Sequence, residues 1–174
     1  MKYVLAVLVE NKPGVLARVA GLFSRRGFNI ESLAVGRTLD RNLSRMTLEV
    51  DADEKTLEQV VKQLNKLINV LKISNLTLEP SVGRELVLIK VRADAASRSE
   101  IQQIAETFRA KIVDVSLQSL IIEVTGNEEK IEAITLLLGH YGILEAVRTG
   151  KIALLRGSKT TKNGEGLKDA ENVL

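Results

Sequence analysis

The stretch 10-ENKPGVLARVAGLFSRRGFNIESL-33 contains a turn, a helix and the start of a strand in one short segment. It begins with Asn-Lys-Pro-Gly at residues 11–14, and Pro followed by Gly is typical of a chain reversal. Apolar residues then recur at the spacing of one helix face: Val15, Val19, Leu22 and Phe23. Gly27 is a helix-stop residue, and FNIESLAVGRT at 28–38 predicts a strand. The segment therefore predicts a corner that leads into an amphipathic helix and back into a sheet.

The rest of the first half completes a known arrangement. KYVLAVLV at 2–9 predicts a strand buried on both faces, and the alternating SRMTLEV at 44–50 predicts another. Asp53 begins a second helix, and VLKISNLTL at 70–78 predicts the last strand. The order β-α-β-β-α-β is that of the ferredoxin-like split βαβ motif, with both helices on one face of an antiparallel sheet. Because a lone unit leaves its other sheet face bare, we expect pairing with a second copy.

The same pattern restarts after Pro80. Strands are predicted at 85–93, 112–116, 120–126 and 143–156, with a Ser97-x-x-Glu100 capping box and Asn127 as the two helix starts. The fold class is therefore α+β, with two ferredoxin-like βαββαβ domains. We expect these domains at residues 1–78 and 84–156, joined by a linker at 79–83. The polar, Gly-rich residues 157–174 are expected to form a mobile tail.

Composition excludes several classes of protein. The 174 residues include no cysteine and one histidine, so disulfides, cysteine-ligated metals and His-rich catalytic or metal sites are not expected. The 25 basic residues are interspersed with 22 acidic ones, so the net charge of +3 does not indicate nucleic-acid binding. The apolar run at the start is too short to span a bilayer and has no cleavage site. We expect a cytoplasmic protein without membrane or nucleic-acid partners and without catalytic activity of its own.

The two predicted strand-to-helix corners differ in chemistry. Residues 92–97 resemble a plain capped helix start, whereas the first corner has Asn11 as a candidate cap, Pro13 to fix φ and Gly14 to allow close approach. Free N–H groups at a helix start attract a carboxylate, and Val15 and Leu16 would form an apolar wall beside it. This chemistry predicts a site for a small molecule with a carboxylate and an apolar side chain. From spacing alone, a tight turn without a ligand is the alternative.

The run NKPGVLARVAGLFSRRGFNIESLAVGRT at 11–38, followed by SRMT at 44–47, resembles the ACT domain of the small regulatory subunit of acetolactate synthase (acetohydroxyacid synthase). That family has the pattern N-x-x-G-x-L-x-R-V-x-G-L-F-x-x-R-G-[FY]-N-I-x-S-L, and every fixed position of it is present here. RELVLIKV at 84–91 and FRAKIVDVS at 108–116 are similar, more loosely, to the family's carboxy-terminal domain. The resemblance covers about residues 1–157.

The resemblance implies a non-catalytic regulatory subunit of branched-chain amino-acid biosynthesis. It implies a homodimer formed through ACT domains, activation of a catalytic large subunit, and feedback inhibition by valine, with leucine and isoleucine as alternative effectors. Thiamine diphosphate, magnesium and FAD are expected on that catalytic partner, and no cofactor on this chain. The implied effector site combines one protomer's corner with the other protomer's second strand: Asn11, Pro13, Gly14, Val15 and Leu16, with Asn29 and Ile30. The substitutions Gly14→Asp and Asn29→His are expected to remove feedback.

The sequence also allows an alternative function and suggests roles for Arg45 and His140. A stand-alone amino-acid-responsive ACT regulator, for example of transcription, would require RVAGLFSRRGFNIESL to form a helix-turn-helix, which Gly27 and the β-branched residues after it disfavour. Arg45 is expected to face outward, either as a contact for the catalytic subunit or as a plain surface arginine. His140 is expected at a helix end, where it would complement the C-terminal dipole.

Overall fold

The computed structural model describes residues 1–161. The chain forms two compact units. Within the described residues, unit 1 consists of Met1–Val82 and residues 151–161, and unit 2 consists of Gly83–Gly150. No helix within residues 1–161 is both long and apolar enough to cross a membrane.

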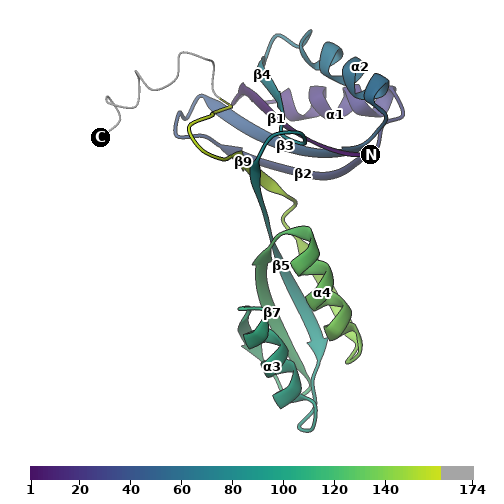
Figure 1. Cartoon of the computed structure of the whole chain (residues 1–174), viewed down its shortest axis with the longest axis vertical. Helices are drawn as coiled ribbons and strands as arrows, with labels where there is room; N and C mark the ends of the chain where they lie inside the picture. The colour runs from purple at the N-terminus through teal and green to yellow at the C-terminus, as the bar shows by residue number, and fades with distance from the viewer. Residues whose placement is uncertain (162–174) are drawn as a thin grey trace. The chain divides into compact units, whose positions relative to one another are not determined.

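Unit 1 has the predicted order of elements, β1 (Lys2–Glu10), α1 (Val15–Arg25), β2 (Ile30–Arg37), β3 (Leu43–Asp51), α2 (Glu54–Leu64) and β4 (Val70–Asn75). The strands form an antiparallel sheet in the order β2-β3-β1-β4. Both helices cover the same face of this sheet (Figure 1). The ferredoxin-like prediction for the first half is therefore confirmed.

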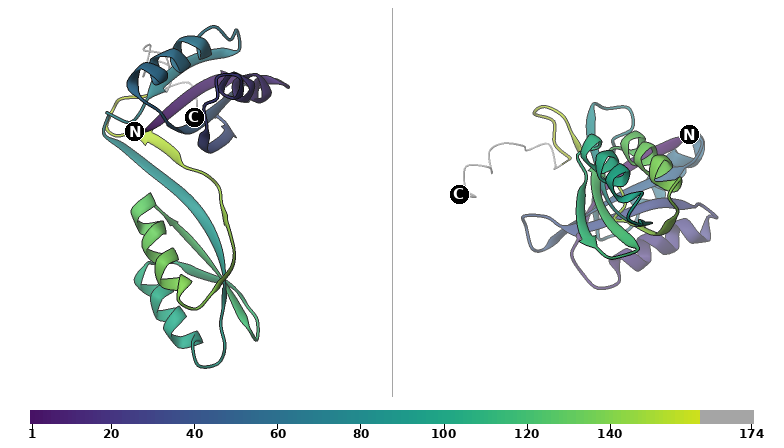
Figure 2. Two further views of the ribbon diagram at one scale, coloured as in Figure 1. Left: turned by 90° about the vertical axis from the view of Figure 1, so that its right-hand side faces the viewer. Right: turned by 90° about the horizontal axis from the view of Figure 1, so that it is seen from below.

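Unit 2 repeats this topology with β5 (Ser81–Arg92), α3 (Arg98–Thr107), β6 (Lys111–Val115), β7 (Ser119–Gly126), α4 (Glu128–Gly139) and β8 (Ile143–Arg148). Its sheet order β6-β7-β5-β8 corresponds to β2-β3-β1-β4. The two green helices of this unit lie together on one face of its strands (Figure 2). The halves also share a register shift, between Leu8 and Val9 opposite β4 and between Lys90 and Val91 opposite β8. The predicted repeat of the β-α-β-β-α-β order is therefore confirmed.

The helix-turn-helix alternative is wrong, because the segment after Gly27 forms the strand β2. Gly27 itself has φ +69° just after α1, a conformation that ends helices and favours glycine.

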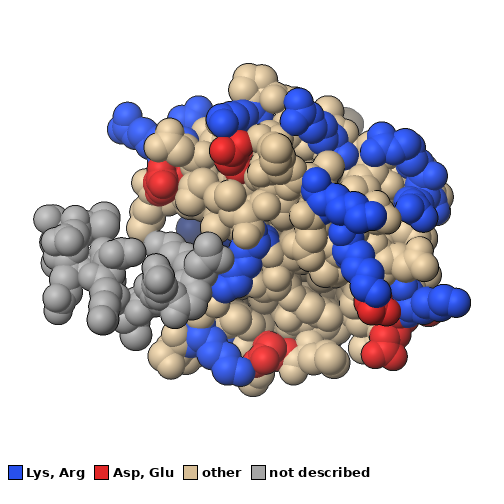
Figure 3. Space-filling model, turned by 90° about the horizontal axis from the view of Figure 1, so that it is seen from above, with Lys and Arg blue, Asp and Glu red and all other residues tan. Residues whose placement is uncertain are grey.

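In the view from above, Lys and Arg side chains are spread over the visible face with uncharged surface between them (Figure 3). Fewer Asp and Glu side chains are visible on this face (Figure 3).

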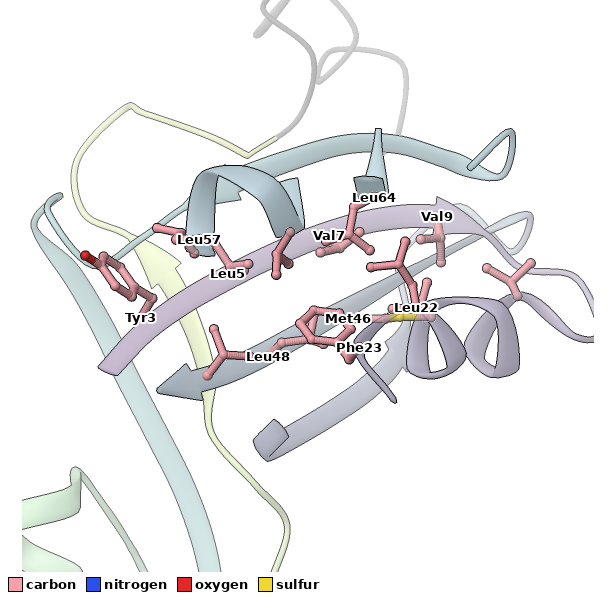
Figure 4. Packing of buried hydrophobic residues seen from close by; sticks show 14 residues of the cluster. Tyr3, Leu5, Val7, Val9, Leu22, Phe23, Met46, Leu48, Leu57 and Leu64 are labelled. Atoms are coloured by element: carbon pink, nitrogen blue, oxygen red, sulfur yellow. The ribbon is translucent and has the colours of Figure 1, made fainter. Parts of the chain in front are cut away.

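The core of unit 1 follows from the alternation along β1. Its odd-numbered residues face the helices, where Leu5 pairs with Leu48 and Val7 with Met46 across the sheet. The apolar stripe of α1 packs onto them (Figure 4): Val15, Val19, Leu22 and Phe23. Ala6, on the opposite face of β1, is also buried, so the predicted burial of this strand on both faces is confirmed there.

Two of the predicted helix starts are confirmed. The Asp53 carboxylate accepts a hydrogen bond from the Thr56 N–H at 2.7 Å, and the Asn127 amide oxygen accepts one from the Lys130 N–H at 3.2 Å. Each of these side chains thereby satisfies an N–H group that has no partner within its own helix.

The capping box at Ser97 is wrong. The Ser97 side chain makes no capping hydrogen bond to α3 and instead donates to the carboxylate of Asp94 at 2.8 Å. The same carboxylate accepts from the N–H groups of Ala96 and Ser97 at 3.0 and 2.8 Å. An ionised carboxylate is a stronger acceptor than a hydroxyl, so Asp94 organises the turn before α3.

Asn127→Ala is expected to lower the free energy of unfolding by about 1 kcal/mol, because the Lys130 N–H loses its acceptor. Urea denaturation followed by circular dichroism measures the difference. The matched control is Gln103→Ala, which removes an exposed polar side chain from α3 in the same unit. Equal stability of the two variants would contradict the assigned cap.

The structure divides the chain differently from the expected domains 1–78 and 84–156 with a linker at 79–83. β5 already begins at Ser81, and residues 151–161 belong to unit 1. The strand β9 (Ile152–Leu155) pairs with β5 and packs its Ala153 against Ala6 and Leu76. The helix-free face of the first sheet is therefore partly covered by the chain's own later residues, so a bare face is not the argument for a dimer.

The expected tail lies only partly within the described residues. Lys159 forms an ion pair with Glu79 at 2.7 Å, and the Thr161 hydroxyl accepts a hydrogen bond from Arg45 at 2.7 Å. These contacts attach residues 157–161 to unit 1. Residues 162–174 lie outside the described part of the chain.

Candidate functional site

The corner between β1 and α1 is built around Gly14. This residue is the N-cap of α1 and has φ +81°, a left-handed conformation that favours glycine. A Cβ placed on Gly14 would meet no other atom within 4 Å. The space in front of the helix start is therefore open to a ligand.

Asn11 holds the corner from the side instead of capping the helix. Its amide Nδ2 donates to the Arg41 carbonyl at 2.9 Å, and its backbone N–H donates to the Asn42 carbonyl at 2.6 Å. The expectation that Asn11 caps α1 is wrong, because the side-chain amide is used to bind the turn between β2 and β3. No described residue donates to its Oδ1, so this oxygen is available to a donor on a ligand.

The first turn of α1 presents unpaired donors. Within residues 1–161, nothing accepts a hydrogen bond from the N–H groups of Leu16 and Ala17, and the first helical bond runs from the Arg18 N–H to the Gly14 carbonyl at 3.0 Å. Leu16 is 43% exposed, whereas Val15 is 4% exposed and packs in the core. Of the two residues predicted as an apolar wall, only Leu16 is therefore exposed beside the helix start, and Val15 belongs to the core. Pro13 is exposed at the outer rim of the same turn.

A polar network lies behind the corner. The buried side chain of Asn69 donates to the Glu10 carboxylate at 2.5 Å and accepts from Arg18 at 2.8 Å. Lys12 binds the other oxygen of Glu10 at 3.1 Å. The hydrogen bond from Asn69, followed by that from Lys12, holds the pKa of the Glu10 carboxyl below its ordinary value. Glu10 is therefore a paired carboxylate beside the site, and Lys12 and Arg18 leave the corner favourable to an anion.

Asn29 and Ile30 lie at the other end of α1. Asn29 is exposed, and Ile30 begins β2 with its side chain half-buried against the core. The 11 residues of α1 separate the two groups by about 16 Å at 1.5 Å per residue. A single chain therefore does not bring the predicted site residues together. These two groups, the corner at 11–16 and the start of β2 at 29–30, are called the half-sites of the predicted site.

Arg45 is not a plain surface arginine. It lies on the helix-free face of the sheet, where one guanidinium nitrogen donates to the Ala153 carbonyl at 2.5 Å. Burial lowers the pKa of the Arg45 guanidinium from its ordinary value. His140 is the C-cap residue of α4, at the predicted helix end, and its ring packs edge-on against Tyr141 with centroids 5.4 Å apart.

Sequence reasoning missed the residues that hold the corner in place, Arg41, Asn42 and Asn69. Each comes from a turn or strand end far along the chain, and no local pattern marks it. Among the described residues there is no group of three or more His, Cys, Asp or Glu side chains that could hold a metal ion.

Comparison with known proteins covers both units. The family model described as the AHAS small subunit-like ACT domain matches residues 5–72. The model described as the small subunit of acetolactate synthase matches residues 84–157.

Individual relatives match over nearly their full length. The probable acetolactate synthase small subunit of Archaeoglobus fulgidus is 61% identical over 159 residues, which are 91% of this chain and 99% of the relative. The acetolactate synthase small subunit of Mycolicibacterium smegmatis is 56% identical over 157 residues, 90% of this chain and 92% of the relative. The crystal structure of the acetolactate synthase small subunit from Thermotoga maritima matches with a TM-score of 0.84 and 45% identity, covering 91% of this chain and 99% of that one.

Proposed function

The chain belongs to the acetolactate synthase small-subunit family, and on that premise we propose that it binds valine at a site shared by two copies and so regulates the catalytic subunit. The family places this chain as the regulatory rather than the catalytic subunit, as the sequence predicted. A small subunit implies a large, catalytic partner. Thiamine diphosphate, magnesium and FAD belong in this proposal to that partner.

The observation that carries the shared site is the separation of the half-sites along α1. In a two-fold symmetric dimer each residue i that contacts j on the partner is matched by j contacting i. If the two copies of α1 run antiparallel, the corner at 11–16 of one protomer faces residues 29–30 of the other. The symmetry then produces two equivalent sites, each of which needs both chains.

The surface around α1 is suited to this association. Within the described chain β2 pairs only with β3, so its other edge has backbone donors and acceptors without a strand partner. On α1, small residues follow one another at positions i, i+4 and i+7: Ala17, Gly21 and Ser24. Small side chains allow two helices to approach closely, and the free edge of β2 beside them favours side-by-side pairing of two copies.

The ligand chemistry follows from the groups at the half-sites. The carboxylate of an amino acid would accept hydrogen bonds from the free N–H groups of Leu16 and Ala17 at the positive end of α1. The partner's Asn29 can accept from the ammonium, and an apolar side chain would lie between Leu16 and the partner's Ile30. Each methyl group contributes about 1–3 kcal/mol to selectivity, so leucine and isoleucine should bind as well, with different affinities.

Calorimetric titration of the purified chain with valine, leucine, isoleucine and alanine tests the proposal. We expect saturation at one valine per chain, and for alanine an affinity at least about tenfold lower. Addition of the chain to the catalytic subunit should raise acetolactate synthase activity, and valine should reduce it. Absence of binding to the isolated chain and to the complex would refute the proposal.

A further inference from the structure

Residues 151–156, here called the strap, lie on the helix-free face of the first sheet and are attached to it by both apolar and charged contacts. Ala153 is 6% exposed and packs against Ala6 and Leu76, which are 3% and 1% exposed. These residues form a small apolar cluster separate from the main core of unit 1. The Arg156 N–H also donates to the Pro80 carbonyl at 2.8 Å.

Two charged side chains of β3 hold the strap. The Lys151 ammonium is 2.5 Å from the Glu49 carboxylate, and the two side chains are only 18% and 10% exposed. Arg45 donates to the Ala153 carbonyl at 2.5 Å. A carboxylate as buried as Glu49 depends on its partner, because an unpaired charge in such a position is strongly destabilising. Lys151 is therefore the cation that stabilises Glu49, and it attaches the first residue of the strap to β3.

The strap also contacts the strand that carries one half-site. The Lys151 N–H donates to the Ser32 hydroxyl at 3.0 Å. Ser32 lies on β2, two positions after Ile30, and it shares the helix-free face with Glu49, its neighbour in the register. Lys151 follows directly after Gly150, the last residue of unit 2. Lys151 thus binds β2, the strand that begins at one half-site, and is also the first residue after unit 2.

We propose that the strap couples the effector site to unit 2, with Lys151 as the residue through which β2 and β3 act on the connecting chain. This inference rests on the proposed function. An effector that bridges two copies at residues 29–30 changes the position of β2, and Ser32 and Glu49 then change their hold on Lys151. Coupling of this kind is a free energy between two sites, so weakening the strap should reduce inhibition without removing the effector's own contacts.

The test uses the full-length chain with its catalytic subunit. Lys151→Met removes the charge that pairs with Glu49, and Ser32→Ala removes the hydroxyl that accepts from the Lys151 N–H. The matched control is Lys159→Met, which breaks the more exposed ion pair with Glu79, whose side chains are 66% and 40% exposed. Valine affinity is measured by calorimetry, and inhibition by the activity of the complex.

We expect both variants to bind valine within about threefold of the wild-type affinity, while saturating valine removes less than about half as much of the activity of the complex as it does with the wild-type chain. The control should match the wild-type chain in both measurements. Hydrogen exchange of amides 152–155 should be faster in Lys151→Met than in the control.

Wild-type inhibition of both variants would overturn the inference. Loss of both valine binding and valine inhibition in the variants would also overturn the inference, because Lys151 and Ser32 would then only shape the effector site. Failure of the proposed function is distinct, because the wild-type chain itself would then bind no valine.

Discussion

Gly14→Asp is expected to lower valine affinity at least about thirtyfold, the equivalent of about 2 kcal/mol, and to leave the enzyme complex active but insensitive to valine. The new carboxylate would occupy the open space in front of the first turn of α1, where the ligand's carboxylate is proposed to bind. It would accept hydrogen bonds from the N–H groups of Leu16 and Ala17 and would repel the negative charge of the ligand. Calorimetry and valine inhibition of the reconstituted complex measure the two effects.

Gly14→Asn is the matched control for this change. Asparagine has the same shape as aspartate without the charge, and both residues tolerate the left-handed conformation that Gly14 adopts at φ +81°. The Asn variant should therefore keep much more of the valine affinity than the Asp variant. Equal losses in the two would assign the effect to backbone strain or bulk and would count against a carboxylate pocket.

Mixing two variants that each fail to bind valine is expected to restore valine binding. Gly14→Asp damages the corner and Asn29→Ala damages the start of β2, so a dimer of either variant has no intact site. In a mixed dimer, however, one site combines the intact corner of one chain with the intact Asn29 of the other. With random exchange of chains about half of the dimers are mixed, so about a quarter of the wild-type capacity should return.

The control for this experiment places both substitutions in one chain. When that double variant is mixed with the wild-type chain, each of the two sites in a mixed dimer contains one damaged half-site. Such a mixed dimer should therefore bind no valine. Co-refolding of each mixture, followed by counting of bound valine, measures the capacities. If mixing the single variants restores no binding, the two half-sites do not meet across a dimer.

Local patterns in the sequence were sufficient for the elements of the fold. The apolar spacing of Val15, Val19 and Leu22 predicted α1 and the face that it buries, because a helix repeats every 3.6 residues wherever it packs. Asp53 and Asn127 could also be recognised as helix starts from local sequence, because a capping side chain bonds to an N–H group within three residues of itself. Ser97 was misread because its hydroxyl donates to the neighbouring Asp94 carboxylate and accepts no bond from the first turn of α3.

The candidate site was predictable in its parts but not in its assembly. The residues around Gly14 and Asn29 could be named from the sequence, together with the carboxylate chemistry of the corner. The bonds that position the corner could not, because Asn11 binds Arg41 and Arg18 binds Asn69, partners 30 and 51 residues away. Sequence spacing contains no information about which distant carbonyl or amide a side chain will meet.

By itself the sequence determined two βαββαβ repeats, the apolar face of each helix, and a corner suited to a carboxylate. Only the tertiary structure joined Asn11 to Arg41 and Arg18 to Asn69 and brought residues 151–156 back onto the first sheet. The reason is physical: periodicity specifies which face of an element is apolar and must be buried. Which distant segment covers that face depends on how the elements are connected and packed, and Glu49 binds Lys151, 102 positions later in the chain, only in the folded structure.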